Sequence, residues 1–222
     1  MAEPALQARD LYRFFRTGDD ETLALRGVSL TVERGETVAV VGPSGSGKST
    51  LLSCLAGIDE PAGGTVTVGG ERVSHRPEAD RARIRARRIG VLLQSRNLLA
   101  HLGIAANIRL AQRAGDHRDR RPSPQELLER VGLGHRGRAI PRELSGGELA
   151  RAGLAVALAN DPDIVLADEP TGELDGQSEQ QILALLRERV GRGAGLLVVT
   201  HSAEVVRIAD RVIALQDGVV IA

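Results

Sequence analysis

The fold of this chain is decided by one stretch, Gly42-Pro43-Ser44-Gly45-Ser46-Gly47-Lys48-Ser49-Thr50. The apolar run Thr37–Val41 precedes it, and the largely apolar segment Leu51–Leu55 follows it. This order predicts a strand, a glycine-rich turn and a helix, and it fills every fixed position of the pattern G-x-x-x-x-G-K-[ST]. The glycines let the backbone curl with its N–H groups facing inward, and the helix start adds the positive end of its dipole. The stretch therefore predicts a cup for phosphate oxygens, in which Lys48 reaches the phosphates and Ser49 ligates Mg²⁺.

Lys48 is the only lysine in a chain that otherwise uses arginine for positive charge. The alternative interpretation, a glycine-rich turn with an incidental lysine, leaves this choice unexplained. A compact ammonium group fits inside a backbone loop, whereas a planar guanidinium is larger and requires a fork-shaped partner. The composition thus favours phosphate binding.

The composition also limits the classes of partner. The 222 residues suffice for one large domain or for a core with an inserted subdomain. The formal net charge is +0, from 29 basic and 29 acidic residues, so no overall field attracts nucleic acid or anionic lipid. With two Phe, one Tyr and no Trp, the chain offers few rings on which bases could stack, and we expect no nucleic-acid partner. One cysteine, Cys54, excludes an internal disulfide and indicates a reducing compartment.

No membrane-targeting or membrane-spanning pattern is visible in the sequence. The segment Met1–Ala5 lacks the basic and apolar regions of a secretory signal, and no apolar run approaches the roughly 20 residues that cross a bilayer. We expect a protein that is soluble by itself and reaches a membrane only through a partner.

Strand and helix patterns alternate over most of the chain. Short strands are predicted within residues 6–41, and an arginine-rich helix over 77–88 is interpreted as a solvated face rather than a nucleic-acid patch. Between about 95 and 160 the pattern is helical, after which strands and helices alternate again. We expect an α/β fold with antiparallel strands near the N-terminus. Its core spans 1–94 and 161–222, and a helical subdomain over 95–160 is inserted into it.

Polar side chains end or follow three further predicted strands. Asp168 and Glu169 follow the strand 164–167, His201 follows a strand near 196–199, and Gln94 ends a third. A polar turn or a structural histidine explains each one alone. Beside a phosphate loop, however, an acidic residue at the end of a second core strand helps to hold Mg²⁺, and Glu169 could polarise an attacking water. The amide of Gln94 can ligate Mg²⁺ or water, and the strand before His201 is expected beside the loop strand.

A second helix start has the sequence Leu144-Ser145-Gly146-Gly147-Glu148. It predicts a capping box in which the Ser145 hydroxyl caps the helix and Glu148 reaches back. Its two glycines also leave N–H groups uncovered, as in an anion site. The chain thus has two helix N-termini that can bind phosphate, which suggests that the two N-termini face one nucleotide from opposite sides.

Together these motifs resemble the ATPase subunit of ATP-binding cassette (ABC) transporters. The resemblance covers nearly the whole chain. A phosphate loop alone is shared by many NTPases, whereas its combination with this signature at this spacing is specific. The motifs follow the family's order: Walker A loop 42–50, Q-loop Gln94, signature 144–148, Walker B Asp168-Glu169, D-loop Leu174-Asp175 and H-loop His201.

The resemblance implies a RecA-like P-loop NTPase core that hydrolyses ATP with Mg²⁺. It assigns catalysis to Glu169, His201 and Gln94, and Mg²⁺ binding to Ser49, Gln94 and Asp168. It also implies a homodimer or heterodimer of ATPase subunits, in which the phosphate loop of one subunit and the signature of the other sandwich each ATP.

The resemblance also places an aromatic ring against adenine and a permease against the helical subdomain. Phe15 falls where the family has the stacking ring, with Tyr12 and Phe14 as nearby alternatives. A transmembrane permease would be contacted through the helical subdomain and the Q-loop region, residues 95–107 included. This implies a cytoplasmic protein, peripheral on the inner face of the plasma membrane.

Segments 79–90 and 170–175 look like the lipoprotein-release and macrolide-export subgroup, whose permeases act on substrates in the periplasm or outer leaflet. The sequence departs from the family at Leu149-Ala150-Arg151, where two arginines around a glutamine are usual, and at Val156, where another arginine is common. These departures affect the signature helix and leave pairing with a different subunit open. The sequence does not name the cargo.

Three other functions stay open at this point. A soluble cassette ATPase acting on nucleic acid or ribosomes usually carries long coiled coils or two fused cassettes, which this chain lacks. A small-molecule kinase leaves the signature and His201 unexplained. A catalytically weak cassette paired with another subunit is compatible with Leu149-Ala150 and Val156.

Overall fold

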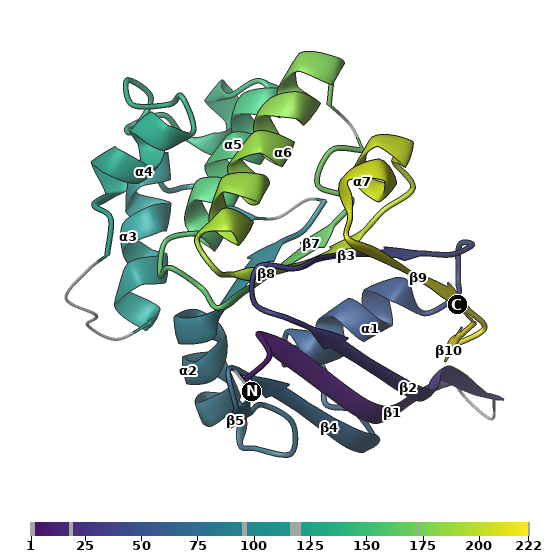
Figure 1. Ribbon diagram of the computed structural model, residues 1–222. Helices are drawn as coiled ribbons and strands as arrows, with labels where there is room; N and C mark the ends of the chain where they lie inside the picture. Colours follow the sequence, from purple (N-terminus) through teal and green to yellow (C-terminus); the bar gives the residue numbers. More distant parts are fainter. Residues whose placement is uncertain (1–2, 18–19, 95–96, 116–120, 173, 222) are drawn as a thin grey trace.

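The structure, a computed structural model, describes residues 3–17, 20–94, 97–115, 121–172 and 174–221. Two β-sheets face each other across one helix, and further helices cover the outer face of the larger sheet (Figure 1).

The larger sheet carries the phosphate loop. Among the described residues it has six strands in the order β10-β9-β3-β8-β7-β6, parallel except for β10. Its central strand β3 is buried at four of its five positions, which explains why it reads as a continuous apolar run rather than an alternating one. The strand before His201 lies directly beside it, as predicted. The bounds are β3 (Thr37–Val41), β6 (Ile89–Leu92), β7 (Ile164–Asp168), β8 (Gly195–Val199), β9 (Arg211–Gln216) and β10 (Val219–Val220).

The smaller sheet is antiparallel, in the order β2-β1-β4-β5 for the described residues. Its strands are β1 (Leu6–Thr17), β2 (Asp20–Val32), β4 (Gly63–Val68) and β5 (Glu71–Arg72). The prediction of short strands over 6–41 was wrong for β1 and β2, which run for 12 and 13 residues. Register shifts such as that between Ala8 and Leu11 interrupt the alternation of apolar and polar residues. Each bulge therefore looks like a strand end in the sequence.

Helix α1 (Lys48–Leu55) lies between the two sheets (Figure 1). Leu51, Leu52 and Leu55 are at most 1% exposed and pack against side chains from both sheets. Burying one such side chain fully is worth about 1.5–3 kcal/mol. This packing fixes the start of α1, and with it the phosphate loop, relative to the sheet.

The opposite face of the larger sheet is covered by α5 (Gly146–Ala157), α6 (Gly176–Gly191) and α7 (Ala203–Ile208). Ile182 and Leu186 of α6 pack with Val165 of β7 in this second core. The helix start at the signature and the N-terminal end of α6 are thereby held on one side of the sheet.

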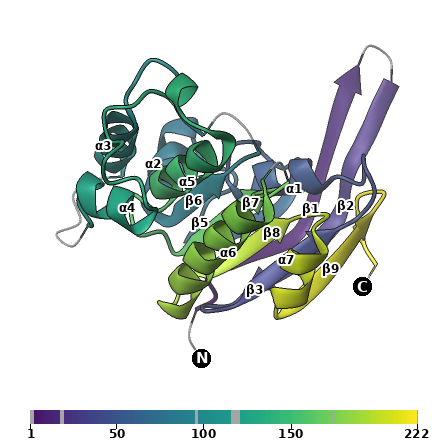
Figure 2. The same cartoon turned by 90° about the horizontal axis from the view of Figure 1, so that it is seen from above.

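The predicted helical insert is present between β6 and β7. It contains α3 (Ile104–Ala114), α4 (Pro124–Arg130), the 3₁₀ turn η1 (Pro141–Glu143) and α5. These helices share a third core around Ile104, Ile108 and Leu128. Figure 2 shows them at the opposite end of the molecule from the β1–β2 hairpin. The division into 1–94 plus 161–222 and 95–160 stays a prediction.

The arginine-rich helix α2 (Glu78–Arg88) forms as predicted, and carboxylates neutralise much of its charge. Arg88 lies 2.9 Å from Glu71 and 2.7 Å from Asp163. Although partial burial opposes it, the pKa of Arg88 is raised by its hydrogen bonds with these two carboxylates. The arginines therefore tie α2 to β5 and to the segment before β7.

Candidate active site

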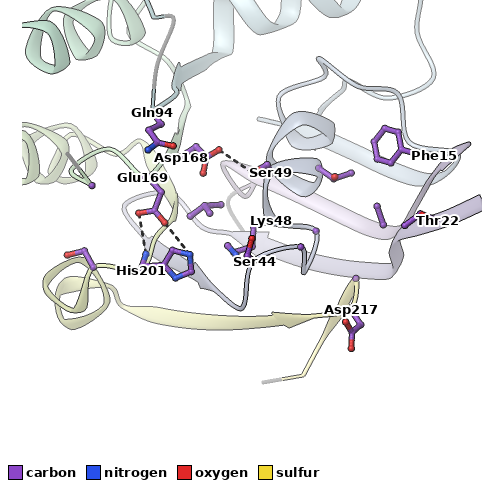
Figure 3. A pocket seen from close by; sticks show the side chains of 18 of the residues that line it. Phe15, Thr22, Ser44, Lys48, Ser49, Gln94, Asp168, Glu169, His201 and Asp217 are labelled. Carbon is purple, nitrogen blue, oxygen red and sulfur yellow. Dashed lines mark hydrogen bonds and ion pairs between the residues drawn. The ribbon is translucent and has the colours of Figure 1, made fainter. Parts of the chain in front are cut away.

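A cavity of about 1200 Å³ opens at the carboxyl ends of β3, β7 and β8 (Figure 3). Ligands of open α/β sheets bind in this position. Most of the predicted site residues line it. They are Phe15, Ser44, Gly45, Gly47, Lys48, Ser49, Thr50, Gln94, Asp168, Glu169 and His201.

The phosphate loop is closed around its lysine. Lys48 is 8% exposed, and its Nζ donates hydrogen bonds to the carbonyl oxygens of Gly42 and Pro43, both at 2.8 Å. A Cβ on Gly42 would lie 2.0 Å from the carbonyl oxygen of Leu215, so only glycine fits there. Gly45 faces open space but has φ +80°, which favours glycine for conformational reasons. The ammonium group is thus held in place by backbone oxygens of the cup.

Sequence reasoning missed a C-terminal turn that supports this loop. Asp217 and Gly218, between β9 and β10, have φ of +49° and +77°. The N–H of Gly218 donates to the carbonyl oxygen of Ser46 at 3.0 Å, and its carbonyl accepts from the N–H of Arg26 at 2.8 Å. Asp-Gly between two strands is the signal of a tight hairpin turn and could have been read from the sequence. The contact of this turn with the phosphate loop could not be read from the sequence.

A second group of oxygen-bearing side chains lies beside the loop. Ser49 Oγ donates to Asp168 Oδ2 at 3.4 Å, and Gln94 lines the same cavity as both of them (Figure 3). Burial raises the pKa of Asp168, and the charge of Glu169 adds to this effect. Hydroxyl, carboxylate and amide oxygens suit Mg²⁺, which takes one or two protein carboxylates and completes its shell with water and substrate phosphates. The residues present therefore fit this ion.

Within the described ranges, no group of three His, Cys, Asp or Glu side chains could hold a metal.

Glu169 is held in a strained conformation next to His201. Its φ of +45° lies in the left-handed region, which is uncommon for a residue other than glycine. Its Oε2 accepts hydrogen bonds from the Thr200 hydroxyl at 3.4 Å and from the His201 N–H at 3.3 Å, and its Oε1 lies 3.7 Å from His201 Nε2. Oε1 is buried without a hydrogen-bond donor among the described residues. One oxygen is therefore anchored, while the other can accept a hydrogen bond from a water molecule.

The cavity distinguishes among the three candidate aromatic rings. Phe15 lines it, whereas Tyr12 and Phe14 are not among its lining residues. The Arg13 guanidinium lies 4.7 Å from the centre of the Phe15 ring. The Phe15 ring lies at the end of the cavity away from Gln94 and Glu169 (Figure 3).

The signature residues 144–148 do not reach this chain's own phosphate loop, and none of them lines the cavity. The predicted capping box is present, because Ser145 Oγ accepts from the Glu148 N–H at 3.3 Å and Glu148 Oε2 accepts from the Ser145 N–H at 2.9 Å. These bonds lower the pKa of Glu148. Gly146 instead lines a smaller neighbouring cleft. Asp175 caps α6 by accepting from two N–H groups of its first turn.

A comparison with known families decides what this arrangement belongs to. The family model described as ABC transporter matches residues 25–172, which include the phosphate loop, the signature and Asp168-Glu169. The chain belongs to the ABC transporter family.

Relatives and solved structures agree with this family. Macrolide export ATP-binding/permease protein MacB 2 of Aeromonas hydrophila is 41% identical over 220 residues, which are 98% of this chain and 34% of that protein. An uncharacterized ABC transporter ATP-binding protein of Thermotoga maritima is 44% identical over 211 residues, 94% of this chain and 90% of that protein. A solved ATP-binding cassette, described as a dimer in a post-hydrolysis state bound to ADP and Pi, is 32% identical with a TM-score of 0.90, covering 98% of this chain and 97% of that one.

The chain is an ABC-type ATPase domain, and the solved dimer that resembles it is bound to ADP and Pi. The expected fold class and enzyme class are confirmed, and the transporter interpretation is supported over a nucleic-acid or ribosome ATPase. The chain spans about a third of the length of the macrolide-export relatives it matches. In the part of the chain that the structure covers, every helix is too short or too polar to be a membrane span.

Proposed function

We propose that this cassette dimerises on ATP and drives a membrane permease for export. The observation that carries the proposal is the division of the predicted nucleotide contacts. Lys48, Asp168 and Glu169 line one cavity, while the signature 144–148 lies outside it and is exposed at Ser145 and Gly146. Each chain thus has a phosphate cup and, separately, a helix start suited to an anion.

In this proposal the phosphate loop binds and orients ATP. Lys48 exchanges its two carbonyl partners for phosphate oxygens, and Phe15 stacks on the adenine. Ser49, Asp168 and Gln94 hold Mg²⁺, which neutralises charge on the phosphates when it is bound. Most of the rate enhancement of phosphoryl transfer comes from such positioning and charge stabilisation.

Glu169 and His201 would act at the γ-phosphate end. Glu169 Oε1 accepts a hydrogen bond from the attacking water and polarises it, a role typically worth about 10²–10⁴-fold in rate. His201, whose backbone N–H holds the other Glu169 oxygen, faces the same space. The strained backbone of Glu169 fits this role, because such strain persists where the surroundings over-determine a functional geometry.

The second half of the site would come from a partner subunit. The Ser145–Gly147 helix start of one copy closes over the ATP held by the other, and Asp175 lies at the same interface. If the partner is a second copy of this chain, the interface is isologous and contains two ATP molecules. ATP then joins the subunits, and hydrolysis releases them because the γ-phosphate contacts are lost.

The opening and closing of the dimer would move a permease that contacts the helical subdomain 95–160 and the Q-loop region around Gln94. Residues 95–96 of that region lie outside the described residues. The relatives named as macrolide export ATP-binding/permease proteins support an export permease as partner. The chain would then work at the inner face of the plasma membrane, and the cargo would be a macrolide, as in the names of those relatives, or a lipoprotein, lipid or peptide.

The test is phosphate release from the purified chain, with and without a permease that co-purifies with it. We expect Mg²⁺-dependent hydrolysis that Glu169→Gln abolishes, while Glu169→Gln still binds ATP and forms a stable dimer. Glu188→Gln, an exposed change on α6, is the control and should hydrolyse normally. Hydrolysis by Glu169→Gln at the parental rate would reject Glu169 as the residue that activates water.

A further inference from the structure

Glu179, in the first turn of α6, joins the two segments that carry Glu169 and His201. Its Oε1 accepts a hydrogen bond from the Thr171 hydroxyl at 3.1 Å and another from the Ser202 hydroxyl at 3.0 Å. Thr171 is two residues after Glu169, and Ser202 directly follows His201. One carboxylate oxygen therefore links the turn after β7 to the turn after β8.

The link continues inward to Glu169. Ser202 donates its N–H to the Thr200 hydroxyl at 2.9 Å, and that hydroxyl donates to Glu169 Oε2 at 3.4 Å. Thr171 and Thr200 are 5% and 0% exposed, so water competes little for these bonds. Glu179 thus anchors the outer end of a continuous series of hydrogen bonds that ends at Glu169.

We propose that Glu179 is a positioning residue that fixes the separation of Glu169 and His201 for hydrolysis. The inference rests on the proposed function, in which both side chains act at the γ-phosphate. Glu169 has φ +45°, and only its surroundings can keep a non-glycine residue in that conformation. By holding Thr171, Glu179 fixes the turn that follows Glu169, and by holding Ser202 it fixes the backbone next to His201.

A competing role for Glu179 is direct proton acceptance, because it also lines the cavity. The two roles differ in what glutamine can replace. The Oε1 of glutamine can accept both hydroxyl bonds, but its amide cannot accept a proton at neutral pH. A positioning role therefore survives Glu179→Gln, and a proton-accepting role does not.

The experiment compares Glu179→Ala, Glu179→Gln and the control Glu188→Gln, which changes a carboxylate on the same helix that pairs with Arg192. We expect Glu179→Ala to lower kcat by about tenfold or more with KM for ATP within about twofold, since small misplacements of reacting groups have effects of this size. Glu179→Gln and the control should keep at least half of the parental kcat. Parental kcat in Glu179→Ala, or an equal loss in Glu179→Gln, would overturn the proposal.

Two further measurements separate this inference from the proposed function. In a Glu179→Ala background, Thr171→Val should lower kcat no further, because its partner is already gone. The NMR signals of the His201 ring, assigned with His201→Gln, should shift in Glu179→Ala but not in Glu179→Gln. A parent protein that does not hydrolyse ATP would contradict the proposed function, while unchanged His201 signals in Glu179→Ala would contradict the positioning role whether or not the protein turns over.

Discussion

The C-terminal turn offers a sharp test of how the phosphate loop is held, through Gly218→Ala. Gly218 has φ +77°, where an alanine costs about 1–2 kcal/mol. Its new Cβ would lie 2.6 Å from the carbonyl oxygen of Ala24, so the turn must shift and lose its bond to Ser46. A net hydrogen bond is worth about 0.5–1.5 kcal/mol. We expect a loss of about 1.5–3.5 kcal/mol in the free energy of unfolding, and a fall in Tm of about 3–14 °C for a chain of this size.

The matched control is Gly193→Ala. Gly193 has φ +93° but open space around its Cβ position, so it should lose only the backbone contribution of about 1–2 kcal/mol. Urea unfolding and ATP titration of both variants separate the two effects. Gly218→Ala should also bind ATP about tenfold more weakly, which corresponds to about 1.4 kcal/mol, whereas Gly193→Ala should bind it normally. If the two variants match in stability and in ATP affinity, the turn does not support the loop.

Three further predictions concern the cavity and the signature. Burial raises the pKa of Asp168, so its charge lowers stability at neutral pH. Asp168→Asn should therefore raise the Tm of the nucleotide-free protein at pH 7 and remove stabilisation by Mg²⁺-ATP. The gain in Tm should fade as the pH falls through the raised pKa of folded Asp168 and be absent below the ordinary aspartate pKa of about 3.9. A lower Tm at pH 7 would contradict this. Phe15→Ala should weaken ATP binding by about 1–3 kcal/mol, whereas Phe14→Ala, which changes a ring outside the cavity, should not. If ATP titrations give the two variants the same affinity, Phe15 does not stack on the adenine. Gly147→Ala places a Cβ 2.5 Å from Ser178 Oγ and should weaken ATP-dependent dimerisation in sedimentation experiments. Adding Ser178→Ala removes this oxygen and should restore dimerisation. If dimerisation is not restored, this clash is not the cause.

Local patterns predicted the parts of the site that depend on neighbours in sequence. The loop 42–50 and the capping box at Ser145 are specified by residues within one turn, so their chemistry can be read directly. The proximity of Glu169 to His201 was also predictable. Both residues follow apolar strands of a parallel sheet, and the carboxyl ends of such strands lie at one edge of the sheet.

The missed features depend on tertiary packing. Gly218 supports the loop from a hairpin far away in sequence, and Glu179 looks like one more acid on an amphipathic helix. Phe15 could not be separated from Tyr12 and Phe14, because bulges in β1 change which face each ring occupies.

The central claim is that the phosphate loop of one chain and the signature helix of another close on the same ATP. It is tested most directly by mixing two defective proteins in a Glu169→Gln background, one with Lys48→Ala and one with Ser145→Arg. Each alone should trap no ATP, because both composite sites of its dimer are damaged. The mixed dimer should trap one labelled ATP, because it contains one site with an intact Lys48 and an intact Ser145 from different chains. If mixing traps no more ATP than the separate proteins, the two surfaces do not share a nucleotide between chains.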